Sequence, residues 1–191
     1  PAESRLMLAY TRDDVLALNT RARPLLADAG ALGAGETVQT ERSAREFAAG
    51  DRLYFLKNDR GLGVKNGSLG TVEKIGNGAL QVRLDGPEQR RIAVDTAQYA
   101  HLEHGYAATV YKAQGVTVDR TYVLASGHMD RHAAYVALSR HRDGVALHYS
   151  RQDFPDQRER GRTLDRDRPK ETALDYPKAF AARRQIDCLA D

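Results

Sequence analysis

The patterning of residues 50–95 restricts the fold of this chain more than any other feature of its sequence. In ALQVRLDG (79–86) apolar and polar side chains alternate, and RRIAVD (90–95) repeats this period of two, which is typical of half-buried strands. Between the apolar runs lie dipeptides suited to tight hairpin turns: Asn66-Gly67, Asn77-Gly78 and Asp85-Gly86. These closely spaced strands and turns predict a small antiparallel β-barrel of the SH3-like type over residues 50–95.

A strand followed by a helix is predicted before this region. The apolar run RLMLAY (5–10) is typical of a buried strand, and Thr11 can cap a helix that carries Asp13 and Asp14 in its first turn. Apolar residues then recur at helical spacing, although Pro24 is expected to kink this helix or end it early.

Helical and strand patterns return after the predicted barrel. ATVYKAQ (108–114) indicates a short helix with Gly115 as its left-handed C-cap. TYVLAS (121–126) predicts a strand, RHAAYVALSRHR (131–142) a helix and GVALHYS (144–150) a final strand.

The order of these patterns predicts an α/β fold. Residues 1–49 and 96–150 form a parallel sheet with helices, and the barrel of residues 50–95 is inserted into it. Residues 151–191 hold 10 Lys and Arg against 9 Asp and Glu, with little apolar content before Phe180. We expect a charged C-terminal tail there, partly helical or mobile rather than packed.

Charge and cysteine content set broad limits on partners. The net charge of +3 permits a polyanionic partner without demonstrating one. Cys188 is the single cysteine, which excludes an internal disulfide and fits a reducing, cytoplasmic location. No apolar run reaches the ~18 residues of a membrane-spanning helix, so no membrane partner is expected. Because the chain starts without methionine and enters a strand almost at once, we expect a fragment of a longer protein.

Three basic residues, Lys112, Arg140 and Arg12, and the hydroxyl of Thr109 are candidates for binding phosphate. Thr109 and Lys112 are three positions apart, so a helix would set their hydroxyl and ammonium groups on one face. Arg140 comes just after the apolar face of a predicted amphipathic helix, where it could take an arginine-finger role, whereas Arg12 directly follows the first strand. We hypothesise that Arg12 and Arg140 converge through the tertiary fold. The alternative for each residue is an ordinary solvated surface position.

Other catalytic and metal-binding patterns are missing from the sequence. The glycine-rich stretch RGLGVKNGSLG (60–70) does not match the G-x-x-x-x-G-K-[ST] pattern that wraps nucleotide phosphates. His101 and His104 lack the cysteines or carboxylates that would complete a metal site, and we expect none. By itself, the chain is therefore expected not to hydrolyse a nucleotide.

Several segments together resemble one protein family. HGYAATVYKAQG (104–115) resembles motif V of the RecD-like branch of superfamily-one helicases, and YVALSRHRDG (135–144) resembles their motif VI. LAYTRDDVLALNTRAR (8–23) is similar to the strand and helix around motif IV. The stretch from Asp167 to Ile186 is similar to a segment of conjugative relaxases of the Ti-plasmid TraA type.

This resemblance implies a fold and an activity. The fold would be the second RecA-like domain of an ATP-dependent 5′-to-3′ DNA helicase within a conjugative relaxase, with an inserted SH3-like barrel. A first RecA-like domain, absent from this sequence, would carry the P-loop and the Mg²⁺ ligands. The implied cofactors are ATP and Mg²⁺. The implied partners are single-stranded DNA, that first domain and, as a further possibility, conjugative transfer proteins.

The resemblance also assigns roles to individual residues. Arg140 falls on the motif VI arginine that completes the ATP site, and Arg12 on or near the motif IV arginine that reaches the terminal phosphate. Gln114 and Gly115 fall on the nucleotide side. The single-strand side is assigned to Thr109, Lys112 and Tyr111.

Tyr111 stands where histidine is usual; a phenol can bond a phosphate or stack on a base, but it cannot become cationic. The alternative function is a non-enzymatic module that binds single-stranded nucleic acid or a transfer protein.

Overall fold

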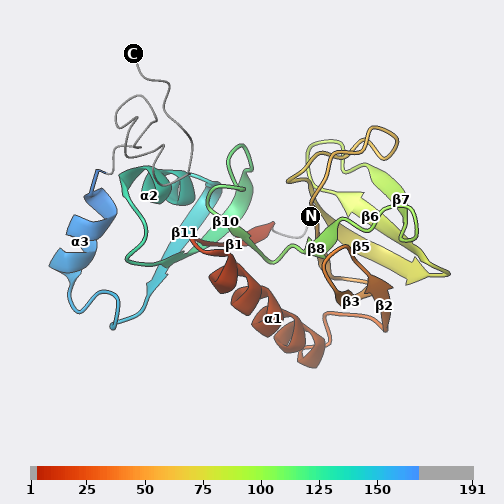
Figure 1. Ribbon diagram of the computed structural model, residues 1–191, viewed down its shortest axis with the longest axis horizontal. Helices are drawn as coiled ribbons and strands as arrows, with labels where there is room; N and C mark the ends of the chain where they lie inside the picture. Colours follow the sequence, from red (N-terminus) through yellow and green to blue (C-terminus); the bar gives the residue numbers. More distant parts are fainter. Residues whose placement is uncertain (1–3, 168–191) are drawn as a thin grey trace, which may run out of the picture.

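The computed structural model describes residues 4–167 (Figure 1). Four parallel strands form one sheet in the order β11-β10-β1-β9. Their bounds are Arg5–Ala9 for β1, Ala107–Thr109 for β9, Val118–Ala125 for β10 and His141–Tyr149 for β11. This sheet with its helices is called the sheet domain below, and it confirms the expected α/β class with a parallel sheet.

Helix α1 (Arg12–Asp28) follows β1 directly, as the sequence predicts. The Thr11 hydroxyl accepts a hydrogen bond from the Asp14 amide at 3.0 Å, which satisfies one of the free N–H groups of the first turn. Pro24 lies inside the helix, and the helix continues past it to Asp28 rather than ending early. α1 packs against β1 and β9.

The other side of the sheet is covered by α2 (Arg131–Leu138), with α3 (Gln157–Asp165) packed on α2 (Figure 1). Phe154 is 1% exposed in the same hydrophobic core, so the segment that leads to α3 is anchored. Helix α3 agrees with the partly helical tail that was expected, whereas the buried Phe154 side chain shows that residues 151–167 are packed at this point. The rest of that segment, including Cys188, lies outside the described residues.

An antiparallel sheet is inserted between α1 and β9, in the order β7-β6-β5-β4-β8. Its strands are β4 (Arg52–Phe55), β5 (Leu69–Gly76), β6 (Ala79–Leu84), β7 (Arg91–Asp95) and β8 (Leu102–His104). Asn77 and Gly78 join β5 to β6 with φ angles of 54° and 75°, the left-handed values that a tight hairpin turn requires. The sheet is open in the described part of the chain, since its edge strands β7 and β8 do not pair, so the expected closed barrel is not confirmed.

A hairpin that the sequence analysis did not predict precedes this sheet. It consists of β2 (Gly35–Gln39) and β3 (Ala44–Ala48). Val38 and Phe47 of the hairpin are buried in one cluster with the core of the antiparallel sheet. Strands β2 to β8 therefore share a core and are called the insert; this core begins before Gly50 and extends to Leu102.

The segment expected to be a short helix has another conformation. Ala107–Thr109 forms strand β9, and hydrogen-bonded turns follow up to Gly115. Pairing of β9 with β1 satisfies backbone groups that an isolated helix would have satisfied internally. α2 also ends earlier than predicted, at Leu138, because β11 already begins at His141. None of the helices within residues 4–167 is long and apolar enough to cross a membrane.

Candidate nucleic-acid and nucleotide interface

The predicted site residues lie at two edges of the parallel sheet. Ala9 pairs with Thr109, so Arg12 and Thr109 both lie at the edge where the strands end at their carboxyl termini. The chain then crosses the sheet domain from Thr109 to Val118, where β10 begins. Val118 N donates to the Arg140 carbonyl at 3.0 Å, so this crossing segment ends beside Arg140 at the amino edge.

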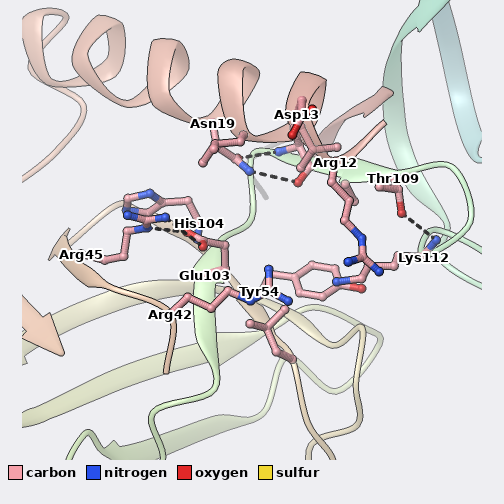
Figure 2. A pocket seen from close by; sticks show the side chains of 15 residues that line it. Arg12, Asp13, Asn19, Arg42, Arg45, Tyr54, Glu103, His104, Thr109 and Lys112 are labelled. Atoms are coloured by element: carbon pink, nitrogen blue, oxygen red, sulfur yellow. Dashed lines mark hydrogen bonds and ion pairs between the residues drawn. The ribbon is translucent and has the colours of Figure 1, made fainter. Parts of the chain in front are cut away.

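At the carboxyl edge a cavity of about 220 Å³ opens between α1, β9 and the insert (Figure 2). Its apolar wall includes Val15, Leu16 and Leu56. Four basic residues also line it, Arg12 from α1, Arg42 and Arg45 from the insert, and Lys112 from the crossing segment, together with the carboxylates of Asp13 and Glu103. Three separate parts of the chain thus bring positive charge to one small cavity.

Most of this positive charge is not neutralised. Arg45 pairs with Glu103 at 2.9 Å, whereas Arg12, Arg42 and Lys112 have no carboxylate within ion-pair distance among residues 4–167. Burial lowers the pKa of Lys112, and the nearby charges of Arg42 and Arg12 lower it further. Glu103 raises this pKa in part, and Asp13 also lines the cavity, but the four cations exceed these two carboxylates, and an excess of clustered positive charge is suited to binding an anion.

Lys112 is held in place by two contacts. Its Nζ lies 5.3 Å from the centre of the Tyr54 ring, within cation–π range. Its backbone N–H donates to the Thr109 hydroxyl at 3.2 Å. Thr109 therefore orients the turn that carries Lys112, and its hydroxyl proton remains able to donate to a phosphate oxygen. Figure 2 shows Arg12 reaching from the start of α1 toward Lys112 and Tyr54.

Asn19 fastens α1 to β9 at the back of this cavity. It is 4% exposed, and its side-chain amide donates to the Ala107 carbonyl at 3.3 Å while accepting from the Ala107 N–H at 2.9 Å. Sequence reasoning missed the cavity-lining role of Asn19, as it missed Arg42, Arg45 and Tyr54. For the insert residues no local signal exists, because only the tertiary fold brings them to β9.

A buried carboxylate joins the insert to both parts of the sheet domain. Asp51 is 0% exposed and accepts from the Ala48 N–H at 2.7 Å and from Arg23 Nε on α1 at 3.2 Å. The Tyr106 hydroxyl, just before β9, also donates to Asp51. Burial raises the pKa of Tyr106, and the Asp51 carboxylate raises it further. The phenol therefore stays protonated and acts as a donor.

Arg140 occupies the amino edge. Its Nε donates to the Val136 carbonyl at 3.0 Å and its Nη2 to the Ser139 hydroxyl at 3.0 Å. Two of its five N–H donors are thus engaged, and within residues 4–167 the other three have no hydrogen-bond partner. Gly115 has a φ of +83°, which confirms the expected left-handed conformation, and it lies three residues before Val118 on the same crossing segment. Gln114 precedes it and is exposed.

The hypothesis that Arg12 and Arg140 converge does not hold in the structure. Arg12 follows the carboxyl end of β1, whereas Arg140 precedes the amino end of β11. Since β1, β10 and β11 are parallel, the two arginines lie at opposite edges of the sheet. Arg12 instead shares the cavity with Thr109 and Lys112, and Tyr111 beside them is 75% exposed.

The two histidines are occupied by structural contacts. His101 Nδ1 lies 2.7 Å from a Glu41 oxygen, and His104 Nε2 lies 2.9 Å from the Glu46 carbonyl. No group of three potential metal ligands occurs in the part of the chain that the structure describes.

Comparison with known proteins places the chain among helicases. Residues 40–148 match the family model for the viral superfamily 1 RNA helicase core domain. The conjugal transfer protein TraA of Agrobacterium fabrum is 43% identical over 96% of this chain, which spans 17% of that protein. The ATP-dependent RecD2 DNA helicase of Deinococcus radiodurans is 36% identical over 51% of this chain and 14% of its own length.

A solved structure agrees with the fold. Pif1 helicase from Bacteroides, in complex with ADP-AlF3 and ssDNA, aligns with a TM-score of 0.61 at 20% identity. The alignment covers 95% of this chain and 46% of that one. At this identity the likeness supports the fold alone.

Proposed function

We propose a function from one premise: this chain belongs to the superfamily 1 helicase core family, whose model matches residues 40–148. The chain acts as the C-terminal half of an ATP-dependent 5′-to-3′ DNA helicase in a conjugative relaxase. It binds single-stranded DNA and completes an ATP site whose P-loop and Mg²⁺ ligands belong to another domain. The chain spans about one sixth of its TraA relative, so this activity describes the longer protein.

One observation carries the strand-binding part of this proposal. Arg12, Arg42 and Lys112 line the carboxyl-edge cavity and form no ion pair within residues 4–167, so the four cations of the lining exceed its two carboxylates, Asp13 and Glu103. A nucleic-acid backbone supplies the closely spaced negative charges that relieve their repulsion. Thr109 adds a hydroxyl donor to the same site, and the exposed ring of Tyr111 lies beside it. Arg12 is accordingly assigned to the strand rather than to the nucleotide.

The nucleotide-binding part of the proposal is argued from residues at the amino edge of the sheet. Arg140 has free N–H donors there, and such a guanidinium can stabilise charge on a transferred phosphoryl group. Gln114 and Gly115 lie between Lys112 and Val118 on the crossing segment that leads to Arg140. We assign all three to the ATP side. A segment that begins at the strand site and ends beside Arg140 is placed to transmit movement between the two ligands.

Salt dependence tests the strand site. The 191-residue chain is titrated against a short oligothymidine by fluorescence anisotropy at several salt concentrations. Each phosphate contact in a single strand contributes about −0.7 to the slope of log affinity against log salt, so three cations predict a slope of about −2. Lys112→Ala should weaken binding and reduce the slope by about 0.7. Lys74→Ala, an exposed lysine of β5 outside the cavity, is the matched control.

ATP turnover tests the amino edge. The chain is joined to a P-loop domain, and Arg140→Ala is compared with Arg151→Ala, an exposed arginine that follows β11. Loss of a phosphoryl-stabilising arginine should lower turnover by about 10³-fold or more, whereas the control should retain it. Unchanged turnover in Arg140→Ala with intact strand binding would favour the non-enzymatic binding module instead. The transfer machinery of conjugation remains a proposed partner of the longer protein.

A further inference from the structure

Aromatic side chains follow the carboxyl ends of three adjacent strands. Tyr111 follows β9 and is 75% exposed, Tyr10 follows β1 and is 41% exposed, and His128 follows β10 and is also exposed. The rings of Tyr10 and His128 lie near parallel, with centres 6.4 Å apart and planes at 19°. Large exposed aromatic side chains usually occur singly on a protein surface, so three at neighbouring strand ends call for a physical reason.

The strand order sets these rings in a row. β9, β1 and β10 are consecutive in the sheet, and Ala9 pairs with Thr109 while Leu8 pairs with Val123. The strand ends that these residues follow therefore lie along one edge of the sheet, where neighbouring strands are ~4.8 Å apart. Tyr149 at the end of β11 is 44% exposed, but one face of its ring is already in cation–π contact with Arg160, 4.2 Å from the ring centre, so it is not counted in the row.

Each of the two tyrosines has a cation close in sequence. Arg12 comes two residues after Tyr10, and Lys112 directly follows Tyr111. Both cations line the carboxyl-edge cavity, and neither forms an ion pair among residues 4–167. A flat apolar ring beside an uncompensated positive charge matches the repeating unit of a nucleic-acid strand, which is a base beside a phosphate. A hydrophobic protein partner would leave these charges unneutralised.

We propose that Tyr111, Tyr10 and His128 form a base-stacking platform for single-stranded nucleic acid. The strand runs across the sheet edge, with bases over the rings and phosphates toward Lys112 and Arg12. This inference rests on the proposed strand-binding function and adds to it the residues that hold the bases. Stacking uses the face that every base has, so the platform binds single strands without reading their sequence.

The polar groups behind the platform agree with sequence-independent binding. The Asn19 amide is used by the Ala107 backbone, and the Glu103 carboxylate is paired with Arg45. His104 Nε2 is bonded to the Glu46 carbonyl. These groups are therefore engaged before a ligand arrives, and they are not placed to distinguish one base edge from another.

Abasic oligonucleotides test the platform. Anisotropy of the 191-residue chain is measured with an oligothymidine and with an abasic strand of the same length and charge. Removing a stacking ring by Tyr10→Ala or Tyr111→Ala should weaken oligothymidine binding by about 5- to 150-fold, the range expected for one base–aromatic stack. Binding of the abasic strand should change by less than about twofold, since it has no base to stack.

Three matched variants complete the test. Tyr10→Phe keeps the ring and should bind oligothymidine like the original chain. His128→Ala should show the same selective loss as the tyrosine variants. Tyr135→Ala removes an exposed tyrosine of α2, 71% accessible, that lies outside the row, and should have no effect. The melting temperature of every variant checks that the fold is retained.

The outcomes separate the platform from strand binding itself. Equal losses for oligothymidine and the abasic strand would overturn the platform, because the rings would then act through the backbone or the fold. Full affinity in Tyr10→Ala and Tyr111→Ala, with loss in Lys112→Ala, would also overturn it while leaving the proposed strand site intact. No binding of either strand by the original chain would refute the proposed function and the platform together.

Discussion

Tyr106→Phe is the substitution whose effect the structure defines best. The change removes one hydroxyl and leaves the ring, which is 7% exposed, in its packed position. That hydroxyl donates to Asp51, a fully buried carboxylate that also receives hydrogen bonds from Ala48 and Arg23. The variant therefore leaves a buried negative charge with one donor fewer, in a region where water does not replace it.

The size of the effect follows from the charge on the acceptor. A hydrogen bond to a charged group contributes about 1.5–3 kcal/mol, against about 0.5–1.5 kcal/mol for a neutral pair. Tyr99→Phe is the matched control, since the Tyr99 hydroxyl is 2.6 Å from the neutral Lys57 carbonyl and Tyr99 is 5% exposed. At about 2–4 °C per kcal/mol for a domain of this size, Tyr106→Phe should lower Tm by about 3–12 °C.

Urea unfolding and thermal melts measure both variants. Because the pKa of Tyr106 is raised in the folded state, its phenol favours folding below the ordinary pKa near 10 and stability falls as pH rises above it. Tyr106→Phe should lack this alkaline decrease. A stability loss below about 0.5 kcal/mol, or one no larger than that of Tyr99→Phe, would refute the role given to the buried carboxylate.

Three further perturbations follow from single contacts. Hydrogen bonds from the Ser4 N–H and hydroxyl, together with Arg142, hold the pKa of Asp119 at about 2. This carboxylate stabilises the fold above its ordinary pKa, and the effect is lost as pH falls toward 2, so Asp119→Asn should flatten the acid limb of a pH–stability curve. The pKa of Lys112 is lowered from 10.5, so affinity for the single strand should decline as pH rises toward 10.5. Lys112→Arg should keep its affinity in this range, because the guanidinium stays charged. A parallel decline in both proteins would contradict the assignment of Lys112 to the strand site. At Gly70 a Cβ would lie 2.6 Å from Val82 Cγ1 and 2.9 Å from the Arg83 carbonyl oxygen. Gly70→Ala should therefore destabilise the insert by about 1–3 kcal/mol, measured by urea unfolding. Gly127→Ala is the control and should be near neutral, because a Cβ there would have no atom within 4 Å.

Local signals in the sequence predicted the elements that depend on local chemistry. Thr11 caps α1 as its position before an acidic turn indicates, and Gly115 adopts the expected left-handed conformation, although the helix that it was predicted to cap is absent. β9 was missed because its three residues become a strand only by pairing with β1, which overrides their helical pattern. The β2–β3 hairpin was missed as well, and the closed barrel remains unconfirmed, since sheet closure depends on contacts between distant strands.

In the candidate site, too, residues from one local segment could be predicted, whereas residues brought in by the tertiary fold could not. Thr109, Tyr111 and Lys112 were found from one short segment, but Arg42 and Tyr54 reach the cavity only through the insert. The error about Arg12 and Arg140 had a cause visible in the sequence. A residue that follows a strand and a residue that precedes one lie at opposite edges of a parallel sheet, so the predicted elements already argued against their convergence.

The central claim is that the carboxyl edge of the parallel sheet binds the single strand. An NMR titration of the ¹⁵N-labelled chain with a short oligothymidine tests this claim directly, because every backbone amide reports its own environment. The largest shifts should fall on Tyr10 to Asp13 and on Thr109 to Lys112. Shifts centred on Arg140 at the amino edge, or on β6 and β7 of the insert, with the carboxyl edge unchanged, would contradict the account.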